Sequence, residues 1–336
     1  MNKTVALIYG GAGREHDVSV DGYAYVKSLL DKRAYTVFSV YIDRDGTWRV
    51  PEIPDASIIF LKKTPHGGYL CCDNLDIKID VAIPLLHGDA GESGEVQGLL
   101  ECAGIKYIGA DVVTGAVCID KHYTKCVTER LGIPTAKWLS FSEKCDTDKA
   151  LRLCEEKIGF PMFIKPRRLG SSIGACAANR PEEFEQAFTL AMDVGTNKVI
   201  VEELITDKRE LECAFYQACG MTIITHPSEI LLHGFYGYNE KYSGDTPTSV
   251  FANIDDYLAK RIREYSELIA AELKLRHLAR IDFFIKGNDI LFNEVNTFPG
   301  FTPTSMYPRM LEKAGIKPED ALYNFIEDAT SDSRSF

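Results

Sequence analysis

The sequence predicts an α/β protein that becomes α+β in its C-terminal part. Short runs rich in valine and isoleucine end at turn residues, a pattern typical of buried parallel strands. Segments in which apolar residues recur at helical spacing lie between these runs. The length of 336 residues indicates two or three domains rather than one.

The first part of the chain, residues 1–112, is expected to form a small α/β domain. Its predicted strands are apolar runs that end at turn residues: 5–9, 37–42 and 81–86. Polar loops follow the first and third strands, at residues 10–19 and 87–98. Because α/β proteins bind ligands at the carboxyl ends of their strands, we expect Glu15 and His87 at one edge of this sheet.

Residues 113–205 are expected to form a second α/β unit. A helix should begin at Asp120, a residue type that caps helix N-termini, and end at Gly132. Further helices are predicted at 147–158 and 182–192, and strands at 162–165 and 199–204. The loop of residues 165–174 holds two glycines beside a strand-end lysine, and its amides suit phosphate groups. On spacing alone, an ordinary turn remains the better interpretation.

The third unit, residues 206–336, contains the most informative segment, a predicted β-hairpin at 280–296. The unit should also hold a strand at 211–216, a polar loop at 235–249 and a helix at 255–274. If the hairpin loop has three residues, the facing pairs are Arg280 with Asn296, Ile281 with Val295, Asp282 with Glu294 and Phe283 with Asn293. A two-residue loop would shift this register by one and divide the polar residues between the two faces.

Two opposed carboxylates beside an amide form a set of oxygen ligands that suits Mg²⁺ bound to nucleotide phosphates. Without a cation, the carboxylates would repel each other. The alternative is an exposed hairpin stabilised by salt bridges, and spacing does not separate the two. The motifs that flank the hairpin favour the metal site.

Composition narrows the classes of function. The formal net charge is −11, from 38 basic and 49 acidic residues, which argues against a broad contact with nucleic acid. No apolar run approaches the length of a membrane span, and no segment resembles a signal peptide. The ten cysteines show no C-x-x-C pair, so reduced thiols are expected. A cytoplasmic protein without membrane or nucleic-acid partners is the expectation.

Five motifs occur along the chain in a fixed order. They are G-G-x-x-x-E-H-x-V-S at 10–19, H-G-x-x-G-E-x-G-x-x-Q-G at 87–98, K-P-x-x-x-G-S-S-x-G at 165–174, R-x-D at 280–282 and N-E-x-N-T-x-P-G-F-T at 293–302. Together, across residues 4–325, they resemble the D-alanine:D-alanine ligase family of ATP-grasp enzymes. The resemblance implies an ATP-grasp fold of three domains, with ATP held between two sheets and a lid loop in the third domain.

The implied reaction joins two D-amino acids in two steps, for use in peptidoglycan. ATP phosphorylates the carboxylate of one D-alanine, and the amine of a second D-alanine attacks the resulting acyl phosphate. By the same resemblance, Glu15 holds the first ammonium and forms a hydrogen-bonded set with Ser171 and Tyr242. His87 and Glu92 lie near this first substrate.

The resemblance also assigns the nucleotide and metal ligands. Lys125, Lys165 and Lys241 contact ATP phosphates, Glu202 and Leu204 meet adenine, and Glu210 binds the ribose. Asp282, Glu294 and Asn296 bind two Mg²⁺ ions, for which Mn²⁺ can substitute. Arg280 and the Gly300 amide stabilise the oxyanion. Ser305 and Met306 meet the second substrate, whose carboxylate Ser305 takes.

Three alternatives remain open. The first is a ligase that joins D-alanine to D-serine, as in vancomycin resistance; Tyr242 argues against D-lactate, for which a histidine is expected in that loop. The second is an ATP-grasp ligase with another acid and amine. The third is a nucleotide-binding regulator without catalysis, which would more naturally lose Arg280, Asp282, Glu294 or Lys165. The resemblance further implies a homodimer.

Overall fold

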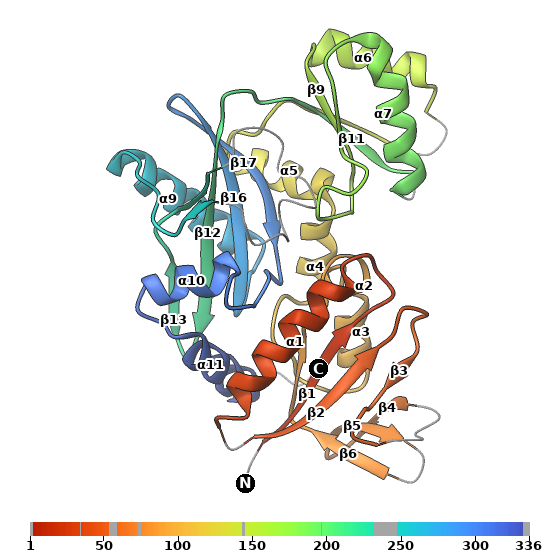
Figure 1. The fold of residues 1–336 in the computed structure, drawn as a ribbon, viewed down its shortest axis with the longest axis vertical. Coiled ribbons are helices and arrows are strands. Elements are labelled where there is room, and N and C mark those ends of the chain that lie inside the picture. The colour runs from red at the N-terminus through yellow and green to blue at the C-terminus, as the bar shows by residue number, and fades with distance from the viewer. Residues whose placement is uncertain are drawn as a thin grey trace.

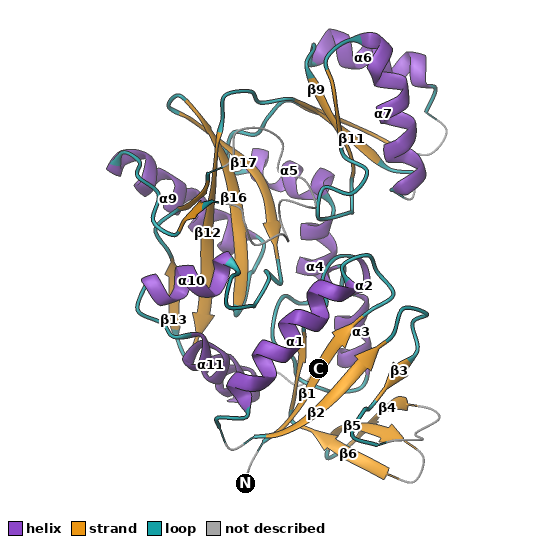
Figure 2. Ribbon diagram, in the orientation of Figure 1, coloured by secondary structure: helices purple, strands orange, loops and turns teal. Residues whose placement is uncertain are grey.

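A computed structural model describes residues 3–33, 35–53, 59–72, 75–142, 145–195, 197–231 and 247–331. In these ranges the chain forms four sheets with helices packed on them (Figures 1 and 2). None of the helices described there is both long enough and apolar enough to cross a membrane. Mixed sheets and helices confirm the predicted α/β and α+β class.

The N-terminal sheet has the strand order β3-β2-β1-β7. Its strands are β1 (Thr4–Gly10), β2 (Thr36–Ile42), β3 (Trp48–Arg49) and β7 (Val81–Pro84). β1 pairs in parallel with both β2 and β7, as the apolar runs predict. Four of the seven β1 side chains are no more than 3 % exposed, because helix α1 (His16–Leu30) and α11 (Pro318–Ser331) pack near this sheet.

The sequence did not predict a second, three-stranded antiparallel sheet in the N-terminal third. It consists of β4 (Ile59–Thr64), β5 (Gly67–Cys72) and β6 (Leu75–Ile79). Three short helices follow β7 in the chain: α2 (Asp89–Glu92), α3 (Glu95–Cys102) and α4 (Val112–Ile119). Helix α5 (Lys121–Arg130) comes next and has the expected ends: Asp120 accepts the His122 N–H at its start, and Gly132 has a φ of +73° beyond its end.

The central sheet has the order β10-β9-β11-β8, and each neighbouring pair is antiparallel. Its strands are β8 (Trp138–Phe141), β9 (Met162–Pro166), β10 (Cys176–Ala178) and β11 (Val199–Glu203). Helices α6 (Thr147–Lys157) and α7 (Pro181–Val194) cover one face, as Figure 2 shows. Phe184 and Phe188 of α7 are buried there, in the helical stripe that the sequence predicts.

The C-terminal sheet has the order β15-β14-β12-β16-β17, with β13 also paired to β12. Its strands are β12 (Arg209–Ala218), β13 (Met221–Ile224), β14 (Ser228–Ile230), β15 (Thr248–Ser249), β16 (Leu278–Lys286) and β17 (Asp289–Asn296). Helices α9 (Asp256–Glu272), α10 (Met306–Lys313) and α11 all contact β12 of this sheet. One buried cluster contains residues of β1, β12, α10 and α11, so a continuous core joins the N-terminal and C-terminal sheets.

The hairpin of β16 and β17 corrects one prediction. Its loop has two residues rather than three, because Lys286 pairs with Asp289. Phe283 pairs with Phe292 and not with Asn293, and the register shifts between Asp282 and Phe283. This shift is a β-bulge, in which Asn293 is the extra residue. The bulge returns the strands to the expected register, with Asp282 opposite Glu294 and Arg280 opposite Asn296.

Candidate functional site

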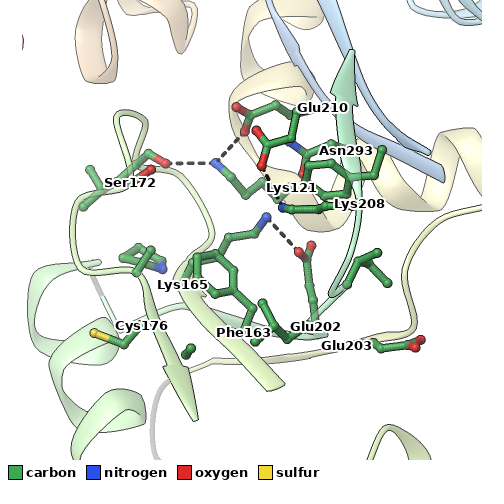
Figure 3. Close-up of a pocket in the computed structure, with 18 of the residues that line it drawn as sticks. Lys121, Phe163, Lys165, Ser172, Cys176, Glu202, Glu203, Lys208, Glu210 and Asn293 are labelled. Atoms are coloured by element: carbon green, nitrogen blue, oxygen red, sulfur yellow. Dashed lines mark hydrogen bonds and ion pairs between the residues drawn. The ribbon is translucent and has the colours of Figure 1, made fainter. Parts of the chain in front are cut away.

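A cavity of about 780 Å³ lies between the central and C-terminal sheets (Figure 3). Its volume falls within the range of ligand pockets. The lining combines apolar and charged side chains: Lys121, Phe163, Lys165, Ile173, Cys176, Glu202, Leu204, Ile205, Lys208, Glu210, Phe284, Asn293 and Glu294 among them. Six predicted site residues therefore meet here, since Ser171 also lines the cavity with Lys165, Glu202, Leu204, Glu210 and Glu294.

Glu202 on β11 lies between two lysines. Its Oε1 is 3.0 Å from Lys125 Nζ and its Oε2 is 2.8 Å from Lys165 Nζ. Figure 3 shows Lys165 and Glu202 pointing toward each other from neighbouring strands, in agreement with their antiparallel register. Burial opposes ionisation of Glu202, but the two ammonium groups outweigh it and lower the pKa of Glu202 to about 2.

The ion cluster of Lys125, Lys165 and Glu202 bears on the nucleotide-binding roles predicted for these three residues. Lys165 and Glu202 reach the cavity, whereas the side chain of Lys125 is 1 % exposed and is not part of the cavity lining. Burial lowers the pKa of Lys125, and Glu202 opposes that change. The adenine role predicted for Glu202 remains a prediction, because the carboxylate here contacts both lysines.

A second polar pair lines the C-terminal side of the cavity. Lys208 Nζ lies 2.9 Å from Glu210 Oε1 and 3.6 Å from the centroid of the Phe284 ring. Glu210 on β12 pairs with Phe284 on β16, so the sheet register brings these groups together. Figure 3 shows Lys208 and Glu210 on the same side of the cavity as Asn293.

Carboxylates from three adjacent strands meet next to the cavity. Asp282 on β16 lies between Glu212 on β12 and Glu294 on β17 in the sheet register. Arg280 donates to both oxygens of Asp282, at 2.8 and 2.7 Å, and its Nε is 3.1 Å from Glu212 Oε1. The nearby carboxylates outweigh burial and raise the pKa of Arg280 well above its ordinary value.

Asp282, Glu294 and Asn296 are residue types that suit a divalent cation, but a bound ligand would have to supply further oxygen donors. Asn296 Nδ2 donates to Asp282 Oδ2 at 3.1 Å, which brings the three predicted metal ligands close to each other. The bulge also places Asn293 beside Glu294 on the cavity wall. In the described part of the chain no three His, Cys, Asp or Glu side chains form a metal-binding group, so phosphate oxygens would have to complete the coordination.

The loops that carry the first three motifs converge at Glu15. Ser171 Oγ donates a hydrogen bond to Glu15 Oε1. A Cβ at Gly88 would collide with the same carboxylate, and Gly88 has a φ of +65°. Gly170 lies close to it as well. The structure therefore brings Glu15 and Ser171 together, as the resemblance implies.

His87 and Glu92 both contact the backbone of Phe298, in the segment between Asn296 and Gly300. His87 Nδ1 lies 3.2 Å from the Phe298 carbonyl oxygen, and Glu92 Oε1 accepts the Phe298 N–H at 3.1 Å. Glu92 Oε2 accepts the Gly88 N–H at 2.9 Å. Burial and the neighbouring Glu15 raise the pKa of Glu92 to about 7, although the two N–H groups oppose this change.

The predicted residues for the second substrate lie at the start of α10. The hydroxyls of Ser305 and Thr302 are 2.7 Å apart, and a Cβ on Gly300 would lie 3.0 Å from Ser305 Oγ. Met306 is the first residue of the helix and its sulfur accepts from Arg309 Nη1 at 3.6 Å. Lys241 and Tyr242 lie outside the described residues.

Sequence reasoning missed several cavity residues. Phe284 could have been found, because it shares the strand face of Arg280 and Asp282 at a spacing of two residues. Lys121 and Lys208 gave no local signal, since a lysine in a helix or a loop is usually a surface residue. Asn293 was predicted to pair with Phe283 on the apolar face of the hairpin, and the bulge instead directs it to the cavity.

Comparison with known proteins identifies the family. The model of the D-Ala D-Ala ligase N-terminus matches residues 4–110, and that of the C-terminus matches residues 127–327. A D-alanine–D-alanine ligase from Corynebacterium diphtheriae is 36 % identical, covering 97 % of this chain and 94 % of its own. One from Borreliella afzelii is 32 % identical, covering 98 % and 96 %.

Solved structures agree with the sequence matches. D-alanyl-alanine synthetase A from Vibrio cholerae superposes with a TM-score of 0.88 at 30 % identity, over 98 % of this chain and 99 % of that one. The VanG D-Ala:D-Ser ligase from Enterococcus faecalis gives a TM-score of 0.86 at 30 % identity, over 97 % and 99 %. The chain therefore belongs to the D-alanine–D-alanine ligase family, whose ATP-grasp fold it shares.

Proposed function

We propose that the protein uses ATP to join two D-alanine molecules into D-alanyl-D-alanine through an acyl phosphate. The observation that carries this proposal is that the cavity between the sheets adjoins the predicted amino-acid site at Glu15. Ser171 and Glu294 both line the cavity between the sheets, and Ser171 donates a hydrogen bond to Glu15 in the predicted amino-acid site. A phosphate bound in the cavity would therefore lie close to a carboxylate held near Glu15.

In the first step, side chains of this chain neutralise and align the phosphates. Lys165 faces the cavity, and Lys125 and Lys241 are assigned the same task by resemblance. Glu202, Leu204 and Glu210 line the wall assigned to adenine and ribose. Asp282, Glu294 and Asn296 would hold magnesium, or manganese in its place, and the bound ion would supply charge stabilisation on the phosphoryl group.

In the second step, the amine of the other amino acid attacks the activated carbonyl. Arg280 and the Gly300 amide are assigned to the developing oxyanion, and such a donor is worth about 3 kcal/mol. Ser305, hydrogen-bonded to Thr302 at the start of α10, binds the carboxylate of this substrate. Met306 lies beside it. The resemblance assigns Tyr242 to a lid loop that would exclude water.

A substrate panel tests the proposal. ADP release is measured with Mg²⁺ and with D-alanine alone, then with D-serine or D-lactate as second substrate, and the products are identified by mass. D-alanyl-D-alanine formed with the highest kcat/KM is the expected result. A higher kcat/KM with D-serine would support the alternative that likeness to the VanG D-Ala:D-Ser ligase keeps open. No ADP release with any D-amino acid would refute a ligase.

The wider setting follows from the same family membership. We infer a cytoplasmic homodimer that supplies the dipeptide for peptidoglycan, with units at residues 1–112, 113–205 and 206–336. Its small-molecule partners are ATP and D-amino acids. Sedimentation equilibrium tests the dimer, and a single species of 37.5 kDa would contradict it.

A further inference from the structure

Two consecutive residues of the C-terminal unit, Arg276 and His277, bind the backbone of Gly109 in the N-terminal unit. Arg276 Nε donates to the Gly109 carbonyl oxygen at 2.7 Å, and His277 Nδ1 accepts the Gly109 N–H at 3.0 Å. The Arg276 guanidinium also lies 4.7 Å from the centroid of the Tyr107 ring. Neither the resemblance nor the motifs assign a role to this pair, which we call the Gly109 clamp.

The second nitrogen of the His277 ring faces helix α11. Nε2 lies 3.6 Å from Asp328 Oδ2, and the other oxygen of Asp328 accepts the Cys219 N–H at 2.7 Å. Helix α11 contacts β7 of the N-terminal sheet and β12 of the C-terminal sheet (Figure 1). The His277 side chain, only 4 % exposed, therefore lies where the two sheets meet.

The hydrogen bond from Gly109 requires that His277 Nδ1 carries no proton. An amide N–H only donates, so the neutral ring must have its proton on Nε2, toward Asp328. Burial lowers the pKa of His277, although Asp328 opposes this change, and the neutral ring is thereby favoured. His277 also has a φ of +60°, which is uncommon for a residue with a side chain and directs attention to what the side chain does.

Gly109 connects the clamp to the predicted site of the first amino acid through Phe298. A Cβ on Gly109 would lie 3.4 Å from the Phe298 ring, so the glycine packs directly against that ring. The backbone of Phe298 contacts His87 Nδ1 at 3.2 Å and Glu92 Oε1 at 3.1 Å. A displacement of Gly109 would therefore reach both residues through one side chain.

We propose that His277 is a positioning residue for the first amino acid. By accepting the Gly109 N–H it fixes the packing of Gly109 on Phe298, and through the Phe298 backbone it keeps His87 and Glu92 in place. The inference rests on the proposed function, since it takes His87 and Glu92 to border the first substrate. Positioning on this scale matters, because a misplacement of about 1 Å can lower a rate about 100-fold.

Steady-state kinetics of the full chain test the proposal. ADP release is measured over a wide range of D-alanine concentrations at saturating ATP, and a two-site rate law separates the KM values of the first and second D-alanine. His277→Leu removes the acceptor and should raise the first KM about 10-fold, with the KM for ATP within about 2-fold of wild type. His277→Asn should stay within about 3-fold of wild type, because its Oδ1 can accept the same N–H and asparagine tolerates a positive φ.

Ile326→Val on α11 is the control for a general loss of stability, because Ile326 is 0 % exposed in the core that the two sheets share. It should lower Tm and leave the first KM within about 2-fold of wild type. If His277→Leu does not fold, His277→Gly replaces it, since glycine suits the positive φ and also lacks the acceptor. A first KM within 2-fold of wild type, an equal rise in the KM for ATP, or an equal rise in His277→Asn would overturn the positioning role.

Nitrogen-15 NMR of histidine-labelled protein checks the clamp without turnover. His277 should show the Nε2–H tautomer at pH 7, and an Nδ1–H tautomer would overturn the proposal. The proposed function and the positioning role fail in different ways. If wild type forms the dipeptide but His277→Leu keeps the first KM, the positioning role is wrong and the ligase stands. If wild type forms no dipeptide, the ligase reaction is wrong, and the role of His277 in it falls even when the tautomer is the expected one.

Discussion

Replacing Glu202 by glutamine tests whether the buried ion cluster stabilises the fold. The substitution keeps the shape of the side chain but removes the charge between Lys125 and Lys165, at 3.0 and 2.8 Å. The amide also turns an N–H donor toward one of two ammonium groups, which are themselves only donors. Both lysines then remain buried without the anion that compensates them.

The size of the effect follows from the pKa of Glu202. That pKa is about 2 in the folded protein against an ordinary value of 4.5. The difference corresponds to about 3 kcal/mol of stability at neutral pH, which agrees with the cost of breaking a buried pair, about 3–5 kcal/mol. Because the folded pKa lies below the unfolded one, this stability is complete above about pH 4.5 and is lost toward about pH 2.

Urea unfolding of wild type and Glu202→Gln measures the difference directly. We expect a loss of about 3 kcal/mol at pH 7 and a loss about 1 kcal/mol smaller at pH 4. Glu203→Gln is the matched control, a partly exposed neighbour on the same strand that Figure 3 shows pointing away from Lys165. Its loss should stay within about 0.5 kcal/mol at both pH values. A loss under about 1 kcal/mol for Glu202→Gln, or one independent of pH, would refute the reasoning.

Three other predictions concern the site. Glu294→Gln should lower kcat by about 100-fold or more with an unchanged melting temperature, because a charged metal ligand is lost; near-normal kcat would remove Glu294 from the metal site. Lys208→Met should raise the KM for ATP about 5-fold at constant kcat, since it loses the contacts to Glu210 and the Phe284 ring; an unchanged KM contradicts this. Glu92 has a raised pKa of about 7 against an ordinary 4.5, so its stability contribution is greatest below about pH 4.5 and falls as pH rises to about 7. Glu92→Gln should therefore gain about 2 kcal/mol relative to wild type between pH 5 and pH 8 in urea unfolding, and a constant difference would count against the raised pKa.

The parts of the fold that the sequence predicted are those where local and tertiary preferences agree. β1 and β7 are apolar at nearly every position because both faces of a parallel sheet are buried, so their runs stand out. Helix α5 is bounded by residues that satisfy its own ends, Asp120 and Gly132. Such signals require no knowledge of the rest of the chain.

The β4–β6 sheet shows where this approach fails. Lys62 and Lys63 occupy adjacent positions in β4, and Asp76 and Lys78 alternate with buried residues in β6. Both strands are short and many of their residues are exposed, so neither a continuous apolar run nor a long alternation marks them. Likewise, the ion pairs of Glu202 join residues 77 and 37 positions apart, and spacing along the chain carries no trace of them.

The metal-site hairpin shows why a register can be predicted while the loop that closes it is not. A three-residue loop and a two-residue loop with a bulge give the same pairs beyond Asp282, so the sequence does not distinguish them there. What fixes the pairs is burial: Ile281 and Val295 are 0 % and 5 % exposed on the opposite face. A shift by one residue would turn Glu294 into that apolar core, at a cost of several kcal/mol for an uncompensated charge. The loop end of the hairpin has no such constraint, because Lys286 and Asp289 are exposed. The extra residue is taken up by the bulge at Asn293, whose side chain lines the cavity beside Glu294.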